Sequence, residues 1–120
     1  MKIKDIPELT IKYDFIFAFC TFLDDFKRSE NKSELIAEQP ETELLKPVEC
    51  CMLACAAHKL ANDNGIETPF WVYDQKYILQ TPVYALNTKN EEYRFFLEQT
   101  SPKEYKQRKL FYGANVLMRV

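Results

Sequence analysis

The chain has 120 residues, a length that suits one domain with one hydrophobic core. Hydrophobic residues make up 47% of the sequence, so its composition is that of a folded protein and not of a disordered one. The net charge of −2 gives the chain as a whole no attraction to nucleic acid or to an anionic membrane surface.

The distribution of charge, the N-terminal sequence and the cysteines indicate where in the cell this protein works. Residues 1–88 hold 9 Lys/Arg against 14 Asp/Glu, a net of −5, whereas residues 89–120 hold 7 against 4, a net of +3. The N-terminus lacks the apolar stretch and cleavage site of a secretory signal, and the longest apolar run, residues 15–23, is too short to span a membrane. We therefore expect a cytoplasmic protein, with no membrane partner, whose four cysteines stay reduced.

The first strong helix signal covers residues 11–28. Phe15, Phe19, Phe22 and Phe26 recur at helical spacing and predict one buried stripe. Burial of each phenylalanine stabilises the fold by roughly 1.5–3 kcal/mol. The polar stretch that follows contains one short helical candidate, residues 33–38, before Pro40, which would stop any helix that ran through it.

A second strong helix is predicted over residues 46–64. Pro47 suits a first helical turn, and Gly65 suits a left-handed C-cap. Residues 50–57 are all apolar and mostly small, which is typical of a central helix that is buried on every side.

The sequence predicts that residues 66–88 form a long irregular or extended segment. Pro69 and Pro82 each disfavour helix in the residue before them, and the apolar residues between them follow no clear period. We expect this segment to wrap over the helices with Trp71 as its anchor, and to form at most a short β-hairpin.

Helical patterning returns at Asn90, which suits an N-cap, with Tyr93, Phe96 and Leu97 on one face of the helix that follows. A further helix is predicted to start at Ser101 and to end near Gly113. In that helix Ser101 would be the cap, Pro102 would occupy the first turn and Glu104 would complete an S-x-x-E capping box. Residues 115–120 would form a last turn on the core.

The fold class that follows is mainly α: a single domain over residues 1–120, made of an N-terminal helical part (1–45) and a second part (46–120). The structural anchors in the second part are Trp71, Ser101, Pro102 and Phe111. The expected core residues are Phe15, Phe19, Phe22, Cys51, Cys55, Leu60, Trp71, Leu97, Tyr105 and Phe111.

Few residues offer chemistry. Cys51, Cys55 and His58 share one helix face, which suggests either a zinc site or a Cys–His nucleophile, but no second ligand pair accompanies them. Buried thiols beside a hydrogen-bonded histidine are the favoured interpretation. With Gly65 and Gly113 as its two glycines, the chain contains no glycine-rich phosphate loop. We predict no catalytic residue, no cofactor and no metal.

Basic residues near the C-terminus are the candidates for contact with a partner or with nucleic acid. Lys103 and Lys106 share a face, whereas Arg108 falls nearer the buried side, where an arginine usually pairs with a carboxylate or caps helix carbonyls. Aromatic side chains alternate with these cations. The full set of candidates is Arg108, Lys103, Lys106, Lys109 and Arg119.

The order P-x-W-V, then a tyrosine–leucine segment with proline, then S-P-x-E-Y-K-x-R-x-L-F and N-V-L-x-R-V, resembles an uncharacterised bacterial module over about residues 45–120. That module occurs in antitoxin-like proteins encoded beside nucleotidyltransferase-like proteins. The matching positions are Pro69, Trp71, Val72, Ser101, Pro102, Arg108, Phe111, Asn115, Leu117 and Val120.

The resemblance implies a non-enzymatic protein-interaction protein, antitoxin-like, whose partner is another protein of nucleotidyltransferase-like type. Some members carry a helix-turn-helix, but the apolar stretch at residues 15–26 does not suit a DNA recognition helix. The alternative function is a nucleic-acid-binding accessory protein that uses the basic C-terminal region.

Overall fold

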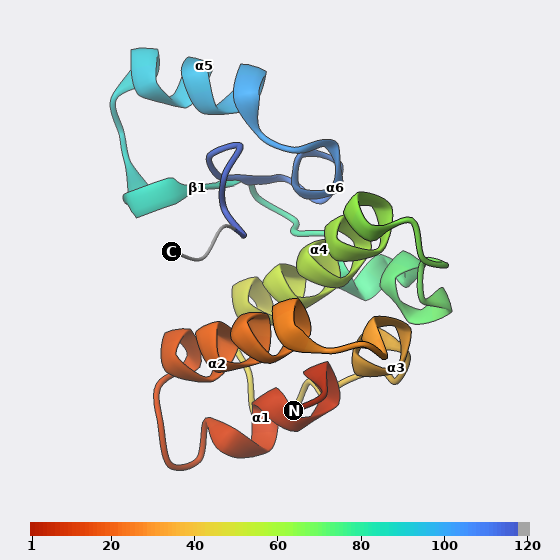
Figure 1. Cartoon of the computed structure of the whole chain (residues 1–120). Helices are drawn as coiled ribbons and strands as arrows, with labels where there is room; N and C mark the ends of the chain where they lie inside the picture. The colour runs from red at the N-terminus through yellow and green to blue at the C-terminus, as the bar shows by residue number, and fades with distance from the viewer. Residues whose placement is uncertain (118–120) are drawn as a thin grey trace.

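Figure 1 shows the computed structural model of the chain, which describes residues 1–117. The predicted mainly-α class is confirmed. The α-helices are α1 (Ile6–Leu9), α2 (Phe15–Arg28), α3 (Lys32–Ile36), α4 (Pro47–Asn64), α5 (Glu91–Thr100) and α6 (Lys103–Lys106). The 3₁₀ turns are η1 (Ile3–Asp5), η2 (Phe70–Tyr73), η3 (Gln75–Tyr77) and η4 (Ala85–Asn87), and the strands are β1 (Val83–Tyr84) and β2 (Leu110–Phe111).

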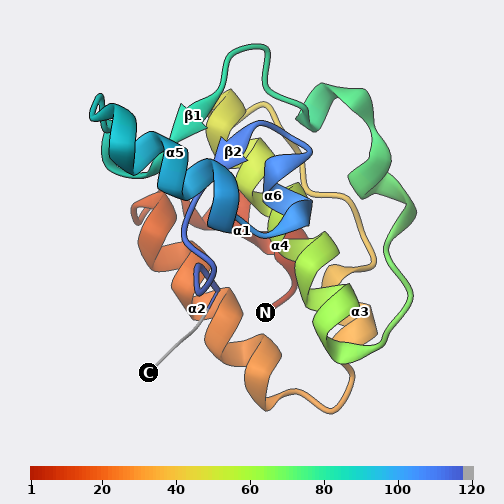
Figure 2. The same cartoon turned by 90° about the horizontal axis from the view of Figure 1, so that it is seen from above.

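Helix α4 is the centre of the fold, as predicted. It starts with Pro47 and ends at Gly65, which takes the left-handed conformation at φ 65°. The small apolar residues 50–57 between these ends are all buried. In Figure 1 α4 runs between α2 on one side and α6 on the other, and in Figure 2 it passes beneath α5 and α6.

Helix α2 carries the predicted phenylalanine stripe, and Phe15, Phe19, Phe22 and Phe26 are all buried. The helix begins at Phe15 and not at residue 11, because the Asp14 side chain accepts a hydrogen bond of 2.7 Å from the Phe17 backbone and caps the helix there.

The N-terminal segment packs onto the core, which no pattern in the sequence had indicated. Ile3 and Ile6 are completely buried. The N-terminal ammonium of Met1 lies 3.1 Å from the Asp25 carboxylate, which ties the start of the chain to α2.

The segment that follows α4 is irregular, as predicted, but its ordered parts are 3₁₀ turns. Trp71 in η2 is buried, and its Nε1 donates a hydrogen bond of 3.0 Å to the Ile36 carbonyl of α3. Its ring also meets the Tyr77 ring edge-on at 5.6 Å. Trp71 therefore fastens this segment to the N-terminal half, which confirms it as an anchor.

The strand pair in the described residues is not the short β-hairpin that the sequence allowed at most. Strands β1 and β2 are parallel, with Val83 opposite Leu110 and Tyr84 opposite Phe111. Parallel strands need a long crossover, and here α5 and α6 provide it.

Ser101 is not the cap of a helix that runs to Gly113. Its hydroxyl donates to the Leu97 and Tyr112 carbonyls, so it fastens the end of α5 to the C-terminal segment. The Glu104 carboxylate accepts from Asn62 of α4 at 2.7 Å instead of completing a capping box. Helix α6 ends at Lys106, and Lys109 then takes a φ of 66°, which turns the chain into β2.

The expected core is confirmed at nine of its ten positions. The exception is Phe111, which is half-buried and stacks on Tyr84 at 5.0 Å. Of the predicted last turn, residues 115–117 form a turn near the core, and residues 118–120 lie outside the described residues. None of the helices within residues 1–117 is long and apolar enough to cross a membrane.

Candidate functional site

Arg108 is a buried arginine and not a surface cation. Its side chain is 2% exposed, so the role in partner contact that the sequence suggested does not fit. Nη1 donates to the Glu104 carbonyl at 2.7 Å, and Nη2 donates to the Val72 carbonyl at 2.8 Å and lies 3.2 Å from His58 Nδ1. Arg108 therefore links α6, η2 and α4. It caps a helix carbonyl, which is one of the two roles that the sequence predicted for it.

The Cys51, Cys55 and His58 side chains come together around Arg108, as their spacing implied. The two sulfur atoms lie 3.8 Å apart and neither cysteine is exposed to solvent. Burial raises the pKa of Cys55, whereas the hydrogen bond from Cys55 lowers the pKa of Cys51. Burial and the nearby Arg108 charge lower the pKa of His58. Within residues 1–117 no three His, Cys, Asp or Glu side chains are arranged to hold a metal ion. The two thiols and the imidazole are therefore packed inside the fold.

Three of the predicted surface lysines lie where a partner can reach them. Lys103, Lys106 and Lys109 are exposed and form no ion pair with any residue in the described range. Of the aromatic residues that alternate with them, Tyr105 is fully buried and cannot stack on a base. Arg119 lies outside the described residues.

An exposed aromatic side chain close to this stretch comes from a different element. Tyr73 of η2 meets the His58 ring edge-on at 5.4 Å, and His58 in turn lies 3.3 Å from the Gln107 amide beside Lys106. Tyr73 and Gln107 also line one small cavity of about 170 Å³. We call residues 103–109 the basic stretch, and the fold therefore places the exposed ring of Tyr73 close to it.

A second candidate surface lies on the segment around α5 (Figure 1). We call residues 83–100 the arm: it contains β1, η4 and α5 (Figure 1). Tyr84 holds it together, since its hydroxyl donates to Glu98 at 2.6 Å and the Arg94 guanidinium lies 4.6 Å above its ring. Arg94 also donates to the Thr88 carbonyl at 2.7 Å. The arm is thus an internally bonded unit; its Val83 and Tyr84 pair with β2, and Leu97 of α5 is buried.

The arm carries four exposed apolar side chains. Leu86 is 89% exposed, Phe95 is 63% exposed and Phe96 is 55% exposed. Tyr93 is also exposed and its ring stacks on Phe96 at 6.3 Å. We call these four residues the arm surface. Tyr93, Phe96 and Leu97, which were predicted to share one helix face, differ in burial: Tyr93 and Phe96 are exposed, whereas Leu97 is buried.

Backbone geometry marks the same region. Leu86 and Asn87 both have positive φ, at 59° and 50°. A leucine in this conformation costs roughly 1–2 kcal/mol. Backbone strain of this kind is found most often at functional sites, and here the strained residue, Leu86, has an exposed apolar side chain. The sequence carried one signal for the arm surface: Phe95 and Phe96 are adjacent, so they cannot both face inward beside Leu97.

Another exposed apolar group lies at the start of α2. It consists of Ile11, Tyr13, Ile16 and Phe17, and the Tyr13 and Phe17 rings lie 4.8 Å apart. Helices α2 and α5 lie on opposite sides of α4 (Figure 1), so this group is separate from the arm surface.

Comparison of the chain with protein-family models, with curated protein sequences and with solved structures found no match. The resemblance to the antitoxin-like module therefore stays a prediction.

Proposed function

We propose that this chain is a non-enzymatic protein-interaction protein, antitoxin-like in that it acts by binding another protein, and that it binds through the arm surface. The observation that carries the proposal is the exposure of Leu86, Phe95 and Phe96 on one small arm. Apolar groups of this kind on a protein surface mark interaction sites, and aromatic side chains supply most of the energy in such interfaces.

The internal bonding of the arm supports this role. Because Tyr84, Arg94 and Glu98 hold α5 in place from its inner side, the outer aromatic rings are already ordered before a partner arrives. A preorganised surface loses less entropy on binding. An exposed helix face with aromatic anchors matches the manner in which amphipathic helices enter apolar grooves on partner proteins. The partner we propose is a protein with such a groove, of the nucleotidyltransferase-like type that the resemblance implies.

Affinity capture from a nuclease-treated lysate of the native host tests the proposal. The tagged chain is compared with the variant Phe95→Ser/Phe96→Ser, whose changed side chains are exposed and so should leave the fold intact. The matched control is Ile16→Ser/Phe17→Ser, which removes similar apolar area from α2. We expect the chain and the α2 control to retain one stoichiometric protein that the arm variant loses. Equal recovery by all three proteins would refute the role of the arm surface.

The three exposed lysines of the basic stretch favour a second candidate, a nucleic-acid-binding accessory protein. Lys103, Lys106 and Lys109 offer three phosphate contacts, and the exposed ring of Tyr73 lies nearby for base stacking. Removal of each lysine that binds a phosphate should reduce the slope of log affinity against log salt by about 0.7 for single strands.

Titration of a fluorescent single-stranded oligonucleotide at several salt concentrations tests this second candidate. The triple variant to Gln at the three lysines should bind with a slope about 2 units shallower than the unchanged chain. Absence of binding at low salt, or an unchanged slope, would remove the nucleic-acid function.

A further inference from the structure

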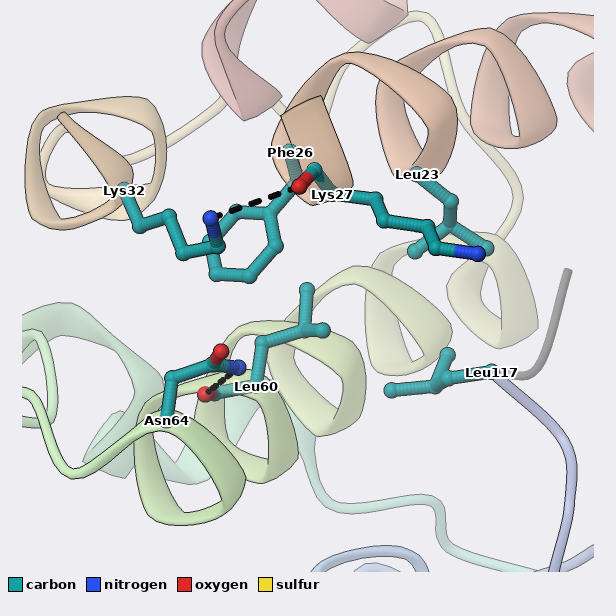
Figure 3. Close-up of a pocket in the computed structure, with 7 residues that line it drawn as sticks. All are labelled: Leu23, Phe26, Lys27, Lys32, Leu60, Asn64 and Leu117. Carbon is teal, nitrogen blue, oxygen red and sulfur yellow. Dashed lines mark hydrogen bonds between the residues drawn. The ribbon is translucent and has the colours of Figure 1, made fainter. Parts of the chain in front are cut away.

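A cavity of about 390 Å³ opens between the C-terminal ends of α2 and α4. Figure 3 shows Leu23 and Phe26 reaching into it from α2, Leu60 from α4, and Leu117 from the end of the described chain. Lys27, Lys32 and Asn64 complete its lining. An apolar interior with a few polar groups at the edge, in this range of volume, is the usual composition of a small-molecule site.

The polar edge of this cavity is cationic. Lys32 Nζ donates to the Ser29 carbonyl at 2.6 Å and lies 3.4 Å from the Lys27 carbonyl and 5.8 Å from the centre of the Phe26 ring. These contacts fix the ammonium at the edge of the apolar space while its charge has no carboxylate partner within the described residues. Lys27 is exposed and forms no ion pair there either.

The other large cavity has the opposite character. It measures about 530 Å³ and is lined by Met1, Asp5, Glu8, Leu9, Ile11 and Lys12, so two carboxylates accompany one lysine and the N-terminal ammonium. The cavity between α2 and α4 has two lysines and no carboxylate in its lining. An anion is thus attracted more strongly to the cavity between α2 and α4 than to the other.

We infer that the cavity between α2 and α4 binds a small amphipathic carboxylate, a free fatty-acid-like molecule of medium chain length. The hydrocarbon chain lies against Leu23, Phe26 and Leu60, and the carboxylate meets Lys27. The ammonium of Lys32 lies at the opposite end of the cavity in Figure 3 and adds to its positive potential. A cavity of about 390 Å³ lies within the range of small-molecule sites and has room for a hydrocarbon chain of medium length. Decanoate has a chain of that length.

Titration of the full-length, isotope-labelled chain with decanoate, followed by amide NMR shifts below the micelle concentration, tests the site. We expect saturable shifts at Lys27, Lys32, Leu60 and Asn64. Affinity should fall about threefold to fourfold for each methylene removed in the series from decanoate to hexanoate, because each methylene loses its burial. Neutral 1-decanol should bind more weakly than decanoate, because it has no charge for the lysines to meet.

The variant Lys27→Gln tests the cationic edge, because this side chain is exposed and its loss should not disturb the fold. We expect about 1.5-fold to fivefold weaker binding of decanoate, the range for one exposed ion pair. The matched control is Lys89→Gln, another exposed lysine that lies in the arm, and it should bind decanoate as the unchanged chain does.

Four results would each overturn the inference: no saturable shift, shifts centred on another part of the chain, equal affinity for decanoate and 1-decanol, or unchanged affinity in Lys27→Gln. Decyltrimethylammonium gives a further check, because its positive charge should exclude it from this cavity. Saturable shifts by this cation at Leu60 and Asn64 would show that the lysines do not select the charge.

Discussion

Replacement of Trp71 by alanine should remove a large part of the stability of this domain. Trp71 is 7% exposed, and truncation of a buried tryptophan costs about 3–5 kcal/mol. The same change leaves the Ile36 carbonyl without its donor, which adds about 1 kcal/mol or more. Since a domain of this size has only about 5–15 kcal/mol in total, the Trp71→Ala variant should be partly or wholly unfolded at 37 °C.

The neighbouring residue supplies the control. Phe70 is 93% exposed, so Phe70→Ala should change the free energy of unfolding by no more than about 0.5 kcal/mol. Trp71→Phe keeps a ring in the core but loses the hydrogen bond to Ile36, and should fall between the two. Urea unfolding followed by far-ultraviolet circular dichroism measures all three. If Phe70→Ala costs as much as Trp71→Ala, the burial assigned to this segment is wrong.

Three further changes test other parts of the fold by the same urea assay. Arg108→Met should destabilise by at least about 2 kcal/mol, because it leaves the Val72 and Glu104 carbonyls without donors, whereas Lys106→Met should cost under about 0.5 kcal/mol; equal costs would refute the burial of Arg108. Leu86→Gly should stabilise by about 0.5–1 kcal/mol, because glycine relieves the positive φ at some cost in unfolded-state entropy, and a loss of stability would contradict this. Burial, with Arg108, lowers the pKa of His58 in the folded protein, so the unfolded chain binds a proton more tightly. The free energy of unfolding should therefore decrease as the pH falls through about 6.5, and His58→Gln should flatten this part of the profile; an equally steep profile in the variant would assign the dependence to other groups.

The long helices were predictable because their signals are local. The phenylalanine stripe of α2 repeats with the period of a helix, and Pro47 and Gly65 mark the two ends of α4. The start of α2 was misjudged because an apolar pattern continues before Asp14, whereas the capping side chain fixes the first turn.

The C-terminal part was harder because its polar groups bond across the fold. Ser101 and Glu104 match a capping box in sequence, but the carbonyls of Leu97 and Tyr112 and the amide of Asn62 compete successfully for them. The parallel pairing of Val83 with Leu110 has no local signal, since the strands are two residues long and far apart in the chain. The cavity between α2 and α4 likewise combines residues from four separate segments.

The candidate surfaces were predicted only in part. Charge alone identified Lys103, Lys106 and Lys109. Helical spacing placed Arg108 nearer the buried side, but its full burial depends on how α6 packs against α4. The arm surface was missed because an aromatic residue in a helical pattern is usually buried, and the choice between Leu97 and its neighbours depends on which side of α5 meets the body.

Photo-crosslinking in the native host tests the central claim most directly. A photoreactive phenylalanine analogue is placed at position 96 in the arm surface, or at position 17 in α2, both of which carry exposed phenylalanines in the chain itself. We expect irradiation to yield one discrete protein adduct from position 96 and none from position 17. No adduct from position 96, or the same adduct from both positions, would contradict the claim that the arm surface binds a protein partner.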